Sequence, residues 1–163
     1  MIVYVTDANI FIDLLYAGLL NLMPRLGLPI VTTQLVADEL NPEQQADLQL
    51  LVSINTLEIR EISLEEINDL KLPIGLSLPD RSVICLAVRE TGVLITGDGL
   101  VRRTAGNLGV DVRGLLWLFD EFVSLDLISP LEAAEKLEFL VVEKGSRQPN
   151  AECNARLGKW RNG

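Results

Sequence analysis

Four acidic residues lie where an expected strand ends or an expected helix runs, and they are the residues whose positions suggest chemistry. The segment 5–14, VTDANIFIDL, places Asp7 at the end of a short apolar strand and directly before a helix. Asp98 follows a second apolar strand, Asp80 opens a helix, and Glu39 lies in a helix after a third strand. Carboxylate oxygens are preferred ligands of Mg²⁺ and Mn²⁺, so these acids could hold a divalent cation if the fold brings them together.

Each of these acids also has a purely structural interpretation. A carboxylate at a helix N-terminus caps free N–H groups and meets the positive end of the helix dipole, which could be the whole role of Asp80 and Asp98. Asp7 could share a structural turn with Asn9, and Glu39 could be a solvated helix residue with the preceding aspartate as a competing acid. The functional interpretation therefore depends on elements that bring the four together.

Short apolar strands alternate with amphipathic helices along the chain. This alternation predicts an α/β fold with a parallel sheet, in which ligands bind beyond the carboxyl ends of the strands. We expect strands over 1–5, 28–32, 57–62, 93–96 and 110–112, and helices over 8–27, 33–41, 42–54, 64–72, 78–92, 98–109, 114–127 and 131–145.

Several helix ends carry their own signals. Ser63 and Glu66 have the spacing of a capping box, Ser77 is a candidate N-cap, and Gly92 is the expected stop of the helix that Ser77 begins. Ser129, followed by a first-turn proline and a third-position acid, makes the start of the helix after it the most sharply defined boundary.

The composition is that of one compact domain. The chain has 163 residues, of which 48% are hydrophobic. No apolar stretch approaches the roughly 20 residues needed to span a bilayer, and the N-terminus lacks the zones of a signal peptide, so we expect a cytoplasmic protein without a membrane segment. Cys85 and Cys153 have no paired spacing, which argues against a zinc cluster or a disulfide framework.

The charge distribution is uneven. The 14 basic and 23 acidic residues give a net charge of −9, which repels a polyanion at long range and disfavours a dedicated nucleic-acid binder. The polar tail from Gly145 carries +3, since four basic residues oppose one acid, and the remainder carries −12. Its charged residues are Arg147, Glu152, Arg156, Lys159 and Arg161.

Four segments carry a family resemblance. VTDANIFIDLL, VADEL, SLPDRSVICLAV and VLITGDGLVRRTAGNLGVDVRG resemble, in order and spacing, the acidic motifs of PIN-domain proteins. These are metal-dependent nucleases that include the VapC-like toxins of prokaryotic toxin–antitoxin pairs. The resemblance covers residues 1–128 and is most specific over 78–114. LISPLEAAEKLEFL and the SRQP tail are similar to a prokaryotic PIN subgroup with an added C-terminal helical segment.

The resemblance implies a parallel sheet of about five strands flanked by helices. We therefore expect a PIN-like catalytic domain over 1–128, and a C-terminal helix and basic tail over 129–163 that pack on it or extend from it. The implied activity is divalent-metal-dependent cleavage of RNA. The implied site comprises four catalytic, metal-binding acids and two supporting residues: Asp7, Glu39, Asp80 and Asp98, with Asn9 and Thr96.

Electrostatics explains why such a cluster would need a cation. Two carboxylates about 6 Å apart repel by roughly 2 to 3 kcal/mol at an effective dielectric constant of about 20. Mg²⁺ or Mn²⁺ relieves this repulsion and could activate water for attack on a phosphodiester. The chain has no histidine, which disfavours a nitrogen-ligated zinc or iron site and a metal-free histidine mechanism. We expect the three aspartates to hold metal and Glu39 to hold metal or orient the water.

The basic residues and the apolar helices each have more than one interpretation. Arg81, Arg102 and Arg103 lie beside the proposed acids and could bind RNA phosphates, or form a solvated helix face. The basic tail, with Trp160 among its charges, could contact RNA, a partner or the body of the protein. PIN toxins usually form homodimers blocked by an antitoxin, so we expect a dimer and an antitoxin partner. The apolar helices over 10–23 and 114–125 could supply a dimer face or the core.

Three other classes deserve comparison. A haloacid-dehalogenase-like phosphatase needs a second aspartate two residues after the first, where this chain has Asn9. A response-regulator receiver needs a lysine after a late strand, and none lies near Asp98. The strongest alternative is a non-catalytic PIN-like binding module whose acids serve only as caps, which the net negative charge favours.

Overall fold

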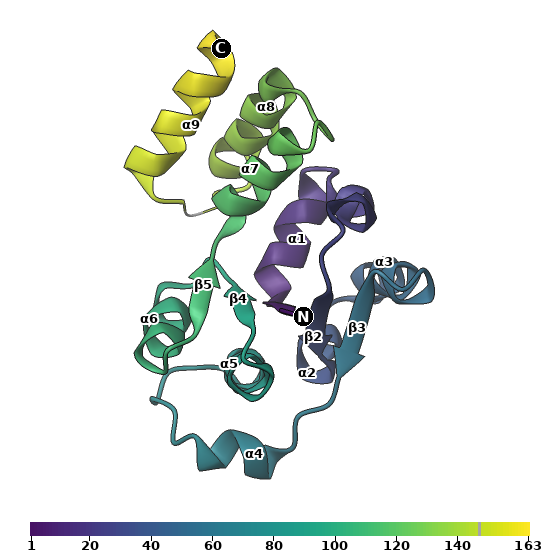
Figure 1. The fold of residues 1–163 in the computed structure, drawn as a ribbon, viewed down its shortest axis with the longest axis vertical. Helices are drawn as coiled ribbons and strands as arrows, with labels where there is room; N and C mark the ends of the chain where they lie inside the picture. Colours follow the sequence, from purple (N-terminus) through teal and green to yellow (C-terminus); the bar gives the residue numbers. More distant parts are fainter. Residues whose placement is uncertain (147) are drawn as a thin grey trace.

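A five-stranded parallel sheet forms the centre of the protein (Figure 1). The computed structural model describes residues 1–146 and 148–163. The strands lie in the order β3-β2-β1-β4-β5 and are β1 (Tyr4–Thr6), β2 (Ile30–Thr33), β3 (Leu57–Arg60), β4 (Val93–Ile95) and β5 (Asp111–Arg113). This arrangement confirms the predicted α/β fold, and every expected strand is present with slightly different ends.

Helices connect the strands and add a C-terminal layer. α7, α8 and α9 lie together at one end of the molecule and α4 lies at the other (Figure 1). The helices are α1 (Ala8–Tyr16), the 3₁₀ helix η1 (Leu20–Leu26), α2 (Gln34–Glu39), α3 (Pro42–Ser53), α4 (Leu64–Asp69), α5 (Leu78–Glu90), α6 (Gly99–Asn107), α7 (Leu115–Ser124), α8 (Pro130–Val142) and α9 (Asn150–Asn162).

The strand order reverses direction between β1 and β4. From β1 the chain adds β2 and β3 on one side, crosses back through α4 and α5, and adds β4 and β5 on the other. Such a reversal is the switch point at which open parallel sheets bind ligands beyond the strand ends. β1 and β4 pair in parallel, with Thr6 opposite Ile95, so the residues that follow them emerge side by side.

The predicted caps are largely confirmed. Ser129 and Glu132 form a complete capping box at α8, and Ser77 caps α5 by accepting from the Asp80 amide. At Ser63 the side chain accepts from the Glu66 amide, but it also donates to the Glu66 carboxylate, which replaces the reciprocal backbone bond of the expected box.

The expected role of Gly92 as the helix stop is wrong. Thr91 takes the left-handed conformation at the end of α5, with φ 51°. Gly92 is instead needed for a close approach, because a Cβ there would lie 2.8 Å from the Val3 carbonyl oxygen. The glycine therefore lets the chain enter β4 directly beside β1.

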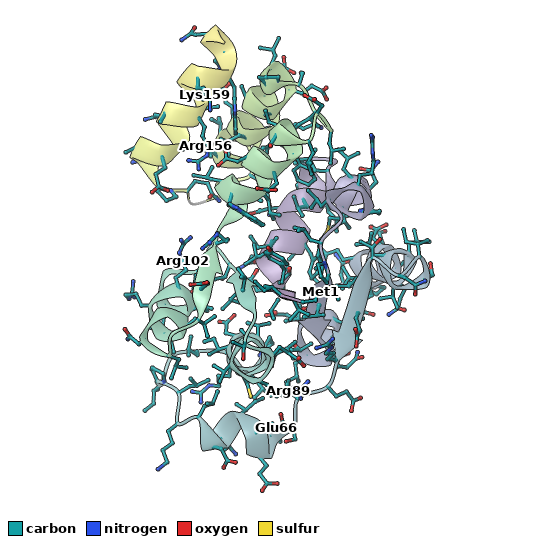
Figure 2. The ribbon with its side chains drawn as sticks, in the orientation of Figure 1. Met1, Glu66, Arg89, Arg102, Arg156 and Lys159 are labelled. Atoms are coloured by element: carbon teal, nitrogen blue, oxygen red, sulfur yellow. The ribbon has the colours of Figure 1, made fainter. Side chains whose placement is uncertain are left out.

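The polar tail folds back on the protein as α9, a helix that the sequence analysis did not predict. Arg156 donates to both carboxylate oxygens of Asp120 on α7, at 2.9 and 2.7 Å, and Trp160 is buried against Phe119. Figure 2 labels Arg156 and the exposed Lys159 on this helix. Of the proposed tail contacts, those with the body of the protein are thus present; Arg147 lies outside the described residues.

The apolar helices supply core rather than a free face. Ile10, Phe11 and Leu14 on α1, and Phe119 and Phe122 on α7, are all at most 1% exposed. Burial of this size stabilises a fold by roughly 1.5 to 3 kcal/mol per large side chain. Within the described residues, no helix is both long and apolar enough to cross a membrane.

Substitution of Gly92 tests the close approach of β4 to β1. Gly92→Ala should lower the free energy of unfolding by about 1 to 3 kcal/mol, because the added methyl group meets backbone that cannot move away. The matched control is Gly106→Ala in α6, where nothing lies within 4 Å and alanine should stabilise by up to about 1 kcal/mol. Urea denaturation measures both, and equal effects would contradict the packing described here.

Candidate metal-binding and catalytic site

Asp7 is a buried carboxylate at the carboxyl end of the central strand. Its side chain is 4% exposed and lies between β1 and α1. One carboxylate oxygen accepts from the Ile10 amide at 3.1 Å, which makes Asp7 the N-cap of α1. The other accepts from the hydroxyl of Thr96. Both oxygens are therefore oriented by the protein.

Thr96 links Asp7 to the neighbouring strand. It follows β4 directly and is fully buried. Its hydroxyl donates to Asp7 and accepts from the Asp98 amide at 3.2 Å. Asp98 in turn caps α6 by accepting from the Val101 amide at 3.0 Å, and is itself exposed. One hydroxyl thus connects the two acids across the switch point.

Asp80 approaches the same edge from α5. This helix packs against β1, β2 and β4, and its connection into β4 places its N-terminus at the carboxyl ends of the strands. Ser77 is the N-cap of α5, and Asp80 lies in the first turn, where hydrogen bonds from Ser77 to its carboxylate lower its pKa against the effect of burial. Asp80 is half-buried.

The three aspartates share one electrostatic environment. Burial, with smaller contributions from the negative charges of Asp80 and Asp98, raises the pKa of Asp7 to about 6 against the hydrogen bonds from Thr96 and Ile10. Burial also raises the pKa of Asp80, and Asp98 adds to that effect. Asp7 therefore keeps its proton up to about pH 6, and above that pH a bound cation would offset the charges of these carboxylates.

Glu39 and Asn9 lie at the margin of this group. Glu39 is the exposed last residue of α2, and its charge is not among those that raise the pKa of Asp7 or Asp80. α2 is nevertheless tied to α5, because the Thr33 and Ser82 hydroxyls are 2.7 Å apart. Asn9 is exposed and lines a cleft with Asp98.

The three arginines differ in their contacts. Arg81 donates to the Leu76 and Pro73 carbonyls, each at 3.0 Å, and so holds the loop before α5. Arg102 and Arg103 are exposed on α6 with no hydrogen-bond partner in the described part of the chain, and Figure 2 labels Arg102. Their guanidinium groups lie over Gly114 and Gly99 respectively.

The sequence analysis missed one wall of the site. Lys144, Ser146 and Gln148 join Asn9 and Asp98 around a cleft of about 350 Å³. They are held there by Asp13, a buried acid on α1. An aspartate within the apolar helix of α1 was a usable signal, but its partners lie more than 130 residues away and no spacing rule connects them.

The donor chemistry suits a hydrated hard cation. In the described residues, no three or more histidine, cysteine or acidic side chains are gathered closely enough to form a metal cluster. Mg²⁺ usually keeps several waters and is bound through one or two carboxylates together with substrate phosphates. The aspartates of this site offer only oxygen ligands, and like charges help to raise the pKa of Asp7. Such carboxylates fit this mode of binding better than they fit a site in which protein ligands surround the metal completely.

Comparison with known families identifies the fold. The chain matches the family model DUF3368, described as a PIN domain, over residues 3–162. The protein belongs to the PIN-domain family. The match extends through α8 and α9, so these helices are part of what this PIN family shares. No curated protein matches the chain.

Asp7 should make the stability of this PIN domain depend on pH when divalent metal is absent. The folded state holds the Asp7 proton up to about pH 6, whereas an ordinary aspartate releases it near 3.8, so the folded state binds more protons between these values. In EDTA the free energy of unfolding should therefore fall by roughly 2 to 3 kcal/mol as the pH rises from about 4 to about 7.

Asp7→Asn should remove most of this pH-dependent fall in the free energy of unfolding. It should retain the cap of α1, since asparagine caps a helix as well as aspartate does. The exposed Asp111 provides the control, and Asp111→Asn should leave the fall unchanged. Thermal denaturation across this pH range measures the effect, and a fall that persists in Asp7→Asn would contradict the assignment.

Proposed function

We propose that this PIN-domain protein is a divalent-metal-dependent endoribonuclease that hydrolyses RNA phosphodiester bonds. The observation that carries the proposal is the buried Asp7 carboxylate, joined to Asp98 through Thr96 and subject to the charge of Asp80. Burying an acid beside two like charges costs stability, which the cap that Asp7 provides to α1 offsets only in part, since its pKa stays raised. A bound cation would neutralise these charges and so remove that cost.

The roles of the aspartates are proposed from their contacts, and that of Glu39 from the family resemblance. Asp7, Asp80 and Asp98 would hold a hydrated Mg²⁺ or Mn²⁺, one or two of them directly and the rest through water, and Glu39 would hold metal or orient the attacking water. The bound cation supplies charge stabilisation at the phosphoryl group and makes water a better nucleophile. Thr96 fixes the direction of Asp7, and the exposed Arg102 and Arg103 bind substrate phosphates.

A finer proposal concerns the cellular role. The motifs that resemble VapC-like toxins favour the toxin of a toxin–antitoxin pair, with an antitoxin as partner. The same resemblance favours a homodimer. Light scattering after size-exclusion chromatography should return twice the 18.0 kDa of one chain, and a mass of 18.0 kDa across the concentration range would contradict the dimer.

A non-catalytic binding module is the second candidate. Asp7 and Asp98 both serve as helix N-caps, which gives each a structural reason to be present. The net charge of −9 also works against RNA. Calorimetric titration with Mn²⁺ separates the candidates, because the nuclease requires binding that Asp7→Asn weakens, whereas a module that uses these acids as caps should give negligible heat.

The direct test is cleavage of a fluorescent single-stranded RNA in Mn²⁺, in Mg²⁺ and in EDTA. Wild-type protein should cleave only with metal, and Asp7→Asn and Asp98→Asn should each lower the rate by at least about 100-fold, since each removes a metal ligand. Both variants preserve the caps, so they should remain folded. Cleavage that survives in the variants would indicate a contaminating ribonuclease and contradict the proposal.

A further inference from the structure

Lys144, Ser146 and Gln148, which lie between α8 and α9, form a hydrogen-bonded wall of the cleft that Asp98 also lines. Lys144 and Ser146 both donate to the Asp13 carboxylate, and Gln148 donates to the Ser146 hydroxyl at 2.9 Å. Lys144 also lies over the Tyr16 ring, 4.7 Å from its centre. Because Asp13 is buried on α1, the helix that Asp7 begins, this wall is anchored to the same element as the proposed site.

The described residues that line the cleft beside this wall are polar and, apart from Asp98, neutral overall. Among them, the charged residues are Asp13, Lys144 and Asp98, and the first two form an ion pair. The remaining groups are amides, a hydroxyl and backbone, which suit the hydrogen-bonding edge of a base or a ribose hydroxyl better than a phosphate. Its volume of about 350 Å³ lies at the lower end of the range for small-ligand sites.

A second, basic cavity adjoins the cleft. It measures about 150 Å³ and is lined by Arg102, Arg113 and Arg156, with Glu152. Arg156 is paired with Asp120, so its charge is already compensated. Arg102 and Arg113 are both exposed, and neither forms an ion pair with any described residue. This cavity therefore suits an anion.

Gln148 lines both cavities, so they adjoin at this residue. Asp98 and Arg102 also lie one helical turn apart at the start of α6, where the Arg102 amide donates to the Asp98 carbonyl at 2.9 Å. Side chains at this spacing are about 5 to 6 Å apart. The polar cleft and the basic cavity beside it match the alternation of nucleoside and phosphate along a nucleic-acid strand.

We propose that the two cavities are adjoining subsites for single-stranded RNA. The polar cleft holds the base and ribose next to the scissile phosphate, and the basic cavity holds the next phosphate through Arg102 and Arg113. Gln148 lies between them and contacts the nucleoside. The inference rests on the proposed function for its choice of RNA as ligand, and it assigns a substrate-positioning role to the segment that joins α8 to α9.

The test is binding without cleavage. An eight-nucleotide, fluorescein-labelled single-stranded RNA of mixed sequence is titrated in EDTA at several KCl concentrations, with fluorescence anisotropy as the readout. Arg102→Ala and Arg113→Ala should each weaken binding about tenfold and lower the slope of log affinity against log salt by about 0.7, the value for one phosphate of a single strand.

Gln148→Ala should weaken binding about fivefold and leave the salt slope unchanged, because it removes a neutral contact. The matched control is Arg25→Ala, which removes an exposed arginine from η1, before β2 and outside both cavities. It should leave both affinity and slope close to wild type. Thermal denaturation of each variant checks that the fold is retained.

Two results would overturn the subsites. One is wild-type protein that binds no RNA in EDTA; the other is Arg102, Arg113 and Gln148 variants that bind like Arg25→Ala. Parallel cleavage assays in Mg²⁺ keep the two proposals apart. Wild type that binds as described but does not cleave contradicts the nuclease and leaves the subsites supported. Wild type that cleaves while these variants bind like the control overturns only the subsites.

Discussion

The buried hydrogen bond from Thr96 to Asp7 is the contact on which the site depends. It joins the residues that follow β1 and β4, the two neighbouring strands from which the chain adds further strands in opposite directions. The same hydroxyl accepts from the Asp98 amide, so the start of α6 is fixed to the start of α1. Without this hydroxyl, Asp7 would keep only the Ile10 amide against a large desolvation cost.

The rest of the fold supports this contact. Gly92 lets β4 lie against β1, Ser77 caps α5 and hydrogen-bonds to Asp80 in its first turn, and the bond between Thr33 and Ser82 ties α2 to α5. The chain after α8 contributes through Lys144, whose bond to Asp13 closes a cleft beside Asp98. The match to the PIN family over residues 3–162 includes Lys144 and the other described residues of this wall.

Local signals allowed the sheet and most helix starts to be predicted from the sequence, and the family resemblance singled out Asp7, Thr96 and Asp98, which the structure links by hydrogen bonds. The stop of α5 was predicted incorrectly, since Thr91 takes the left-handed conformation for which glycine is ordinarily preferred. α9 was missed because its stability comes from burial of Trp160 and the pairing of Arg156 with Asp120, which no local pattern encodes. The Asp13–Lys144 wall was missed for the same reason, while the assignment of the four acids as metal ligands stays a prediction.

The central claim is that Asp7 is buried among like charges in order to receive a cation. Its most direct test is the pKa of the Asp7 carboxyl, measured by NMR on protein with ¹³C-labelled aspartate, first in EDTA and then in saturating Mg²⁺. The account predicts a pKa of about 6 in EDTA and a markedly lower pKa with Mg²⁺, because a bound cation favours the ionised form. A pKa that Mg²⁺ leaves near 6 would contradict it and leave Asp7 as a helix cap.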